Sequence, residues 1–222
     1  MRFLTLNINP SKYSHVNVSM LTDDERTKRI NNLINEKDHD VIFFIEQWYP
    51  VFSGVQLYLE QIDYDFYKPT GFNWHRSYAG VIVAAKKKHT VTSSDGTGFV
   101  NETGKWLCVE IDSTLYLGVH YPQPGIAWND FHESVERFSR EAHPSLIIGD
   151  FNTPAGRKIT IGDYRDVLPM EPTCATNKKL DYAFVKNGLM IEGEELINSV
   201  RMAGNKMLFS DHSATSVKLS MI

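Results

Sequence analysis

Apolar residues form short runs along this chain, and two of these runs have almost no polar interruption. They extend from Asp40 to Ile45 and from Ser145 to Ile148, and Val, Ile, Leu and Phe fill most of their positions. Strands that are covered on both faces, as in parallel sheets flanked by helices, have this composition. We therefore predict two doubly buried β-strands at these positions.

Seven further runs are shorter or alternate between apolar and polar residues, a pattern typical of strands. They are Arg2–Ile8, Tyr64–Lys68, Ala79–Ala85, Lys105–Ile111, Leu115–His120, Leu180–Val185 and Ser213–Leu219. The polar stretch from Asn9 to Leu21 predicts a loop, and turns are predicted at Lys86–Lys88 and Asp112–Thr114. The segment from Ser93 to Gly104 contains three glycines and predicts a hairpin loop.

Three segments carry apolar residues at helical spacing. Thr22 and Glu25 match a capping box, so the first helix begins there and runs to about Lys37. The second helix is predicted from Ser53 to Ile62, and the third near residues 127–141. The residues predicted to face inward are Ile30, Leu33 and Ile34, then Val55, Leu59 and Ile62, then Trp128, Phe131, Val135 and Phe138.

The order of these elements indicates the fold class. The chain opens with a strand, a helix and a second strand, and a similar group follows. Two such groups favour two β-sheets that pack face to face, with helices on the outside. We therefore expect an α/β fold of four layers, with two mixed sheets inside. We assign residues 1–222 to one domain, a length that supports one large core.

Composition and charge narrow the function classes. Hydrophobic residues make up 42% of the chain and charged residues 23%, as in ordinary globular domains. The formal net charge is −4. This value argues against a protein that coats nucleic acid through bulk positive charge, but it is compatible with an enzyme that has a local basic patch.

The sequence shows neither a signal peptide nor a membrane span. Asn7, Asn9 and Pro10 interrupt the first apolar run, and no run approaches the roughly 18 apolar residues of a spanning helix. We therefore expect a cytoplasmic protein without a membrane contact, a monomer with no obligate protein partner. Cys108 lies in an alternating apolar run and is expected to be a buried thiol, and nothing indicates a disulfide with Cys174.

Polar residues of chemical interest lie at the ends of the predicted strands. They are Asn7 and Asn9, Glu46, His120, Asp150 and Asn152, Asp181, and Asp211 with His212. Strand ends and the loops beyond them are places where a rigid scaffold presents catalytic groups to substrate. Residues two positions apart in a strand share a face, as Asn7 and Asn9 do. Acids, amides and imidazoles gathered in this way suit a divalent metal and a phosphate.

Each of these residues has a simpler explanation when it is taken alone. An Asn or Asp at a strand end is commonly a turn or capping residue. Glu46 could pair with a surface lysine, and His120 could be a hydrogen-bonded core histidine. The coincidence of all these positions, together with the strings Gly-Asp-Phe-Asn at 149–152 and Ser-Asp-His at 210–212, favours function.

These motifs resemble those of the endonuclease/exonuclease/phosphatase superfamily, which contains deoxyribonuclease I, exonuclease III-type nucleases, sphingomyelinases and inositol polyphosphate 5-phosphatases. The resemblance extends from Leu4 to Val217. It rests mainly on residues 149–153, on Lys-Leu-Asp-Tyr at 179–182 and on Ser-Asp-His at 210–212, which occur in the expected order. Leu-Asn-Ile at 6–8 and Glu46 add weaker matches. The resemblance implies a deoxyribonuclease I-like sandwich.

The resemblance also implies a role for each motif residue. Glu46 would be the main ligand of Mg²⁺ or Mn²⁺, with Asn7 and Asp211 near the metal and Asn9 at its edge. Asp150 would orient or deprotonate the attacking water, and Asn152 would hold a phosphate oxygen. His212, oriented by Asp181, and His120 would contact the phosphate.

The chain departs from parts of the family pattern. Ile45 stands where many members carry Gln, and Asn9 stands where exonuclease III-type enzymes carry Asp. Those enzymes have Tyr-x-Pro-Asn where this chain has His-Tyr-Pro-Gln at 120–123. The histidine is closer to deoxyribonuclease I, the sphingomyelinases and the phosphatases, so the resemblance does not favour abasic-site repair.

Several residues outside the motifs are candidates for substrate contact. Arg76 and Tyr78 either line the cleft or lie on the surface, and Lys178 and Lys179 beside Asp181 could contact a phosphate. Lys86–Lys88 fit a solvated turn better than a contact with nucleic acid. Trp74, Tyr121 and Trp128 could stack on bases, although Trp128 fits better as a residue that packs its helix.

These observations lead to one preferred function and two alternatives. We expect a phosphodiesterase that depends on Mg²⁺ or Mn²⁺ and acts as a nuclease on DNA. The first alternative is a phosphatase or phosphodiesterase for a small or lipid-linked phosphate, although no exposed apolar hairpin suited to a membrane stands out. The second is a non-catalytic binding module, which the presence of every expected acid and imidazole disfavours.

Overall fold

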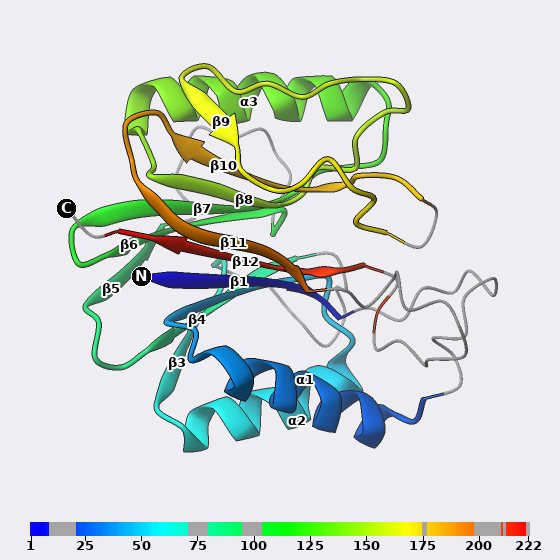
Figure 1. The fold of residues 1–222 in the computed structure, drawn as a ribbon, viewed down its shortest axis with the longest axis vertical. Helices are drawn as coiled ribbons and strands as arrows, with labels where there is room; N and C mark the ends of the chain where they lie inside the picture. The colour runs from blue at the N-terminus through cyan, green and yellow to red at the C-terminus, as the bar shows by residue number, and fades with distance from the viewer. Residues whose placement is uncertain are drawn as a thin grey trace.

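The computed structural model describes residues 1–8, 21–70, 80–94, 104–174, 177–197, 210 and 212–220. Two sheets pack face to face, and helices cover their outer faces, so that the described chain forms four layers (Figure 1). This is the arrangement that the sequence predicts. In the described ranges, no helix combines the length and apolar composition that crossing a membrane requires.

The first sheet, called sheet A, has the strand order β11-β12-β1-β2-β4-β3. Its strands are β1 (Arg2–Asn7), β2 (Val41–Ile45), β3 (Tyr64–Tyr67), β4 (Val81–Lys86), β11 (Ile191–Ile197) and β12 (Ala214–Leu219). β1 and β2 are parallel and are connected through α1 (Asp23–Lys37), while all other neighbours are antiparallel. Helices α1 and α2 (Tyr49–Gln61) lie below this sheet in Figure 1.

The second sheet, called sheet B, repeats this plan with the order β5-β6-β7-β8-β10-β9. Its strands are β5 (Val91–Ser94), β6 (Trp106–Ile111), β7 (Thr114–His120), β8 (Leu146–Asp150), β9 (Tyr164–Asp166) and β10 (Asp181–Lys186). The parallel pair is β7 and β8, connected through α3 (Ile126–Ala142), and its other neighbours are antiparallel. Each sheet therefore has a helix-linked parallel pair at its centre.

The apolar core has one layer between the sheets and one under the helices on each side. Phe3, Phe43 and Ile148 belong to the cluster between the sheets. A Cβ atom on Gly118 would lie 2.5 Å from the Phe43 ring, so only glycine lets the two sheets approach this closely here. Since Gly118 is two residues before His120, this close contact lies beside the predicted site.

Most of the predicted elements are confirmed, with shifted ends. The capping box of Thr22 and Glu25 is present at the start of α1. Helix α2 starts at Tyr49 rather than Ser53, because Pro50 fits the first turn of a helix, where its missing N–H is not needed. No strand was predicted at β5, β9 or β11, and Ser93 and Ser94 of β5 were assigned to a loop.

Charged groups pair at the end of sheet A where β2 begins. Lys86 pairs with Asp38, and Lys88 Nζ lies 2.6 Å from Asp40 Oδ1. These lysines therefore have partners within the turn region, and they lie at the opposite end of β2 from Glu46. Elsewhere in the fold, Cys108 and Cys174 are both buried thiols.

His39 is a fully buried histidine at the same end of the sandwich, and we expect it to make stability depend on pH. Its Nε2 atom lies 3.1 Å from Ser216 Oγ. Burial, assisted by the positive charge of Arg2, lowers the pKa of His39 from 6.5 to about 4. The unfolded chain therefore binds this proton at a higher pH than the folded chain does. Stability is complete above about pH 6.5 and is lost as the pH falls toward 4.

The change to test this is His39→Gln, compared with the unchanged protein by urea unfolding between pH 7.5 and 4. The unchanged protein should lose up to about 3 kcal/mol from this residue over that range, since one pKa unit corresponds to about 1.4 kcal/mol. In the variant, the free energy of unfolding should depend less on pH, because the contribution of His39 is absent. Parallel pH curves for the two proteins would show that His39 is not responsible.

Candidate functional site

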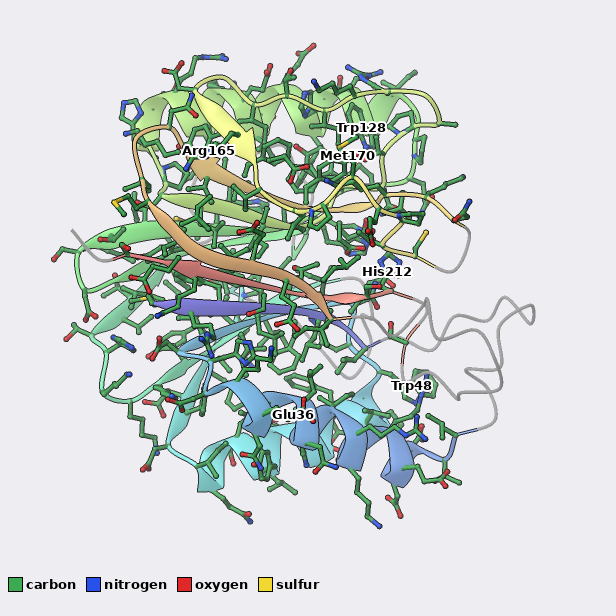
Figure 2. All side chains as sticks on the ribbon, viewed as in Figure 1. Glu36, Trp48, Trp128, Arg165, Met170 and His212 are labelled. Carbon is green, nitrogen blue, oxygen red and sulfur yellow. The ribbon has the colours of Figure 1, made fainter. Side chains whose placement is uncertain are left out.

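The predicted site residues that the structure describes lie at one end of the sandwich. Asn7 and Asp150 end β1 and β8, His120 ends β7, and Glu46 directly follows β2. Asp181 begins β10 and pairs with Asp150, while His212 precedes β12. Figure 2 shows His212 at this end, between the half of the molecule that carries Trp48 and the half that carries Trp128.

Strand alternation aims four of these side chains into the space between the sheets. Asn7 shares a face with Phe3, and Asp150 shares a face with Ile148, both of which belong to the core between the sheets. His120 and Asp181 follow the same rule on β7 and β10. These polar side chains therefore lie between the two sheets, next to the apolar core and at the end of the sandwich.

Glu46 breaks this alternation. Phe44 packs under the helices, so regular alternation would send the side chain of Glu46 to the helical side as well. Its φ angle is instead 54°, in the left-handed region that non-glycine residues rarely adopt. Its Oε1 atom lies 3.2 Å from His120 Nε2 of sheet B, so the side chain crosses to the other sheet.

Glu46 is an ionised carboxylate held by two neighbours. Asn7 Nδ2 donates to its Oε2 atom over 3.3 Å, and His120 lies against Oε1. Burial opposes ionisation, but the hydrogen bond and charge of His120, with the charge of His212 and the Asn7 bond, outweigh it and lower the pKa to about 2. The side chain is still 26% exposed, so it can reach a bound ion.

Asp150 is a buried carboxyl group between two imidazoles. Its Oδ2 atom lies 4.0 Å from the Nε2 atoms of both His120 and His212. Burial raises its pKa to about 6, against the opposing positive charges of His212 and His120 and with a contribution from Asp181. A carboxyl group with a pKa near neutrality can take up and release a proton at working pH.

His212 is oriented by Asp181. Its Nδ1 atom lies 3.0 Å from Asp181 Oδ2, so Nδ1 carries the proton that it donates to the carboxylate, and Nε2 faces Asp150. Thr173 Oγ1 in turn accepts from the backbone N–H of Asp181 over 2.9 Å. An acid at one ring nitrogen fixes both the tautomer and the direction of the other nitrogen.

Asn152 lies in a tight loop after β8. Its φ angle is 41°, and its backbone N–H donates to Asp150 Oδ1 over 2.8 Å. Its side-chain Nδ2 donates to the Tyr121 carbonyl over 2.8 Å, and its Oδ1 accepts from Gln123 Nε2 over 3.1 Å. Asp150 and Asn152 are therefore fixed relative to each other and to the end of β7.

An aromatic cluster supports this loop from behind. Trp128 of α3 donates its Nε1 hydrogen to the Phe151 carbonyl over 2.7 Å, and Tyr121 stacks on the Phe151 ring. Both Tyr121 and Trp128 are fully buried. They cannot stack on bases as one reading of the sequence allowed, because no ring face is open to a ligand.

The remaining predicted residues do not join this cluster. Lys179 pairs with Asp166 and donates to the Leu168 carbonyl over 3.0 Å, so the contacts of its ammonium are with groups outside this cluster. Lys178 is exposed. Asn9, Trp74, Arg76, Tyr78 and Asp211 lie outside the described residues.

Two residues near the site were not proposed as site residues from the sequence. Lys105 Nζ lies 3.5 Å from His120 Nδ1, on the opposite side of the ring from Glu46. Gln123 bonds Asn152, as described above. The position of Gln123 three residues after His120 gives a local signal, whereas the contact of Lys105 depends on how β6 and β7 pair.

The donor set fits a hard divalent ion. Glu46 provides an ionised carboxylate, and the amide of Asn7 lies beside it. Mg²⁺ is commonly bound through one or two carboxylates while it keeps several waters. Among the residues that the structure describes, no group of three or more His, Cys, Asp or Glu could form a complete cage. Glu46 and Asn7 would thus hold such an ion with solvent as the remaining ligand.

Comparison with known proteins identifies the family of the chain. A sequence model of the Endonuclease/Exonuclease/phosphatase family matches residues 14–212. The chain belongs to that family. Members of the family hydrolyse phosphoester bonds and generally use divalent metals. A search of curated protein sequences finds no match.

Solved structures show that the fold is shared. A Bacteroides thetaiotaomicron protein of this family has a TM-score of 0.73 at 15% identity, with 99% of this chain and 97% of that chain covered. The mannosyl-6-phosphatase Bt3783 of the same species gives 0.71 at 15%, with both chains covered completely. The human Nocturnin catalytic domain gives 0.68 at 14%, covering 100% of this chain and 93% of that one.

Gly149 lies next to Asp150 in β8, and its replacement should lower the stability of the fold. Its φ angle is 147°, and a Cβ atom would lie 1.9 Å from the Val119 carbonyl oxygen of β7. Gly149→Ala should lower the free energy of unfolding by at least about 3 kcal/mol, since backbone strain and overpacking each cost about 1–3 kcal/mol. Urea unfolding measures the loss.

Gly193→Ala is the matched control, because Gly193 also lies in a strand but a Cβ there would meet nothing within 4 Å. Equal stability of the Gly149 and Gly193 variants would show that β7 and β8 can separate without cost.

Proposed function

We propose that this protein is a divalent-metal-dependent phosphodiesterase that acts as a nuclease, with DNA as its substrate. The observation that supports this most strongly is the Asp150 carboxyl group, which lies 4.0 Å from the Nε2 atoms of two imidazoles. The Asp150 carboxyl group can take up and release a proton, and the two imidazoles can bind the oxygens of a phosphate beside it.

The number of imidazoles favours a diester. A phosphodiester has two non-bridging oxygens, and the Nε2 atoms of His120 and His212 both lie 4.0 Å from Asp150 Oδ2. His120 Nε2 lies 3.2 Å from Glu46 Oε1 and would exchange that carboxylate for a phosphate oxygen when substrate binds. The Asp181 carboxylate at Nδ1 supports a positive charge on His212, which suits contact with an anion. DNA is the diester proposed because the chain belongs to a family that includes endonucleases and exonucleases.

In this proposal, each residue has one task. Asp150 takes the proton of the attacking water, for which a pKa near 6 is well placed. Asn152 donates its remaining amide hydrogen to one of the two non-bridging oxygens, which it shares with one imidazole, and the other imidazole binds the second. A divalent ion, when bound, contributes positive charge that stabilises the charge developing on the phosphate and the leaving oxygen.

The experiment that tests this function compares substrates in parallel. Supercoiled plasmid, linear duplex, single-stranded DNA and bis-p-nitrophenyl phosphate are incubated with Mg²⁺, Mn²⁺ or EDTA. DNA cleavage that EDTA abolishes supports the proposal. Turnover of the small diester while DNA stays intact would replace DNA with a small or lipid-linked phosphate, and no turnover of any of these diesters would contradict the phosphodiesterase activity.

His212→Ala and Asp150→Asn should each reduce cleavage by at least about 100-fold, as expected when a positioned acid or base is lost. Steady-state rates on the best substrate measure the effect, and both proteins should keep a folded circular dichroism spectrum. Near-normal turnover by either variant would remove that residue from the mechanism.

Glu46→Gln should weaken metal binding without unfolding the protein. In the unchanged protein, saturating Mg²⁺ or Mn²⁺ should raise the thermal midpoint, because a ligand that binds only the folded state stabilises it. The variant should lose most of that increase, while its midpoint in EDTA stays within a few degrees. Glu60→Gln, on the exposed face of α2, is the control. A large fall in the EDTA midpoint would make Glu46 a structural residue instead.

A further inference from the structure

We propose that Gln123 is a positioning residue that sets the orientation of the Asn152 amide. This inference rests on the proposed function, in which Asn152 contacts the phosphate. Gln123 Nε2 lies 3.1 Å from Asn152 Oδ1, and Gln123 follows His120 by three residues. It therefore links the end of β7 to the loop after β8.

The hydrogen-bond directions follow from the chemistry of the partners. A backbone carbonyl can only accept, so the Asn152 atom that lies 2.8 Å from the Tyr121 oxygen must be the nitrogen. The other end of that amide is then Oδ1, and Gln123 must donate to it. The two contacts hold opposite ends of one planar group.

The hydrogen bonds to Tyr121 and Gln123 fix the orientation of the Asn152 side-chain amide. Asn152 Nδ2 has two hydrogens, and one of them is bound by the Tyr121 carbonyl. The Asn152 side chain is buried, and its backbone N–H is bound to Asp150 Oδ1, so the residue cannot shift as a whole. The second Nδ2 hydrogen is thereby the one available to a phosphate beside Asp150.

Without the donor from Gln123, only the Tyr121 contact would hold the amide. Rotation about χ2 of an Asn is broad, so Oδ1 would sample positions in which the free hydrogen no longer points at the substrate. A small misplacement of a group that acts in the transition state lowers the rate more than substrate binding. We expect Gln123→Met to lower kcat about 10-fold, with KM changed less than about 2-fold.

The decisive experiment is a double-mutant cycle. Gln123→Met has nearly the shape of Gln but no N–H, and the second change is Asn152→Gly, because glycine accepts the φ angle of 41° without strain. All four proteins are assayed on bis-p-nitrophenyl phosphate and on plasmid DNA with Mg²⁺, and their thermal midpoints are measured. Gln56→Met is the control, because Gln56 donates to Glu60 on α2, away from the site.

If Gln123 acts through Asn152, the 10-fold loss disappears in the Asn152→Gly background, and midpoints for Gln123→Met and Gln56→Met stay close to that of the unchanged protein. Losses that multiply in the double variant, or a raised KM, would mean that Gln123 contacts substrate itself and would overturn the inference. A loss of activity in Gln123→Met that accompanies a large fall in its thermal midpoint would also overturn the inference. An unchanged protein that hydrolyses no phosphoester would overturn the proposed function, and this inference with it.

Discussion

A carboxyl group that is almost completely buried needs compensation from its surroundings, and in this protein that requirement centres on Asp150. The imidazoles of His120 and His212 lie 4.0 Å from one oxygen, and the Asn152 N–H donates to the other. Two of these residues have their own support, since Asp181 pairs with His212 and Gln123 donates a hydrogen bond to the Asn152 side chain. The loop geometry, the glycine before Asp150 and the aromatic cluster behind Phe151 all serve this placement.

The topology explains why these groups meet. In both sheets a helix connects two parallel strands, so the carboxyl ends of β1, β2, β7 and β8 lie at one end of the sandwich. The antiparallel neighbours β10 and β12 begin where those strands end, and they add Asp181 and His212. Close packing at Gly118 then brings the two sheets near enough for Glu46 of one half to reach His120 of the other.

The sequence predicted those parts of the fold and site that depend on local pattern. The apolar runs of β2 and β8 and the capping box of α1 are strong local signals, and both sheets follow from their order. Strand β11 escaped because Ile-Glu-Gly-Glu-Glu-Leu-Ile forms a polar edge, and β9 because it has only 3 residues. Within the site, residue types and strand ends were readable. The reversal of Glu46 was not, because a left-handed φ angle leaves no pattern in the chain. The turn at Asp112–Thr114 predicted that β6 and β7 are neighbours, but it did not predict that the Lys105 side chain reaches His120.

The pairing of β1 with β12 also means that the residues around Asp150 come together only late in protein synthesis. Arg2 pairs with Lys218, so β1 must wait for β12, which is synthesised much later, before the two strands can pair in sheet A. His212 arrives with that late strand. Contacts between such distant segments form slowly, and partly made chains lack one of the two imidazoles beside Asp150. A chain that is still being synthesised therefore carries β1, β2, β7 and β8 before the arrangement of side chains around Asp150 is complete.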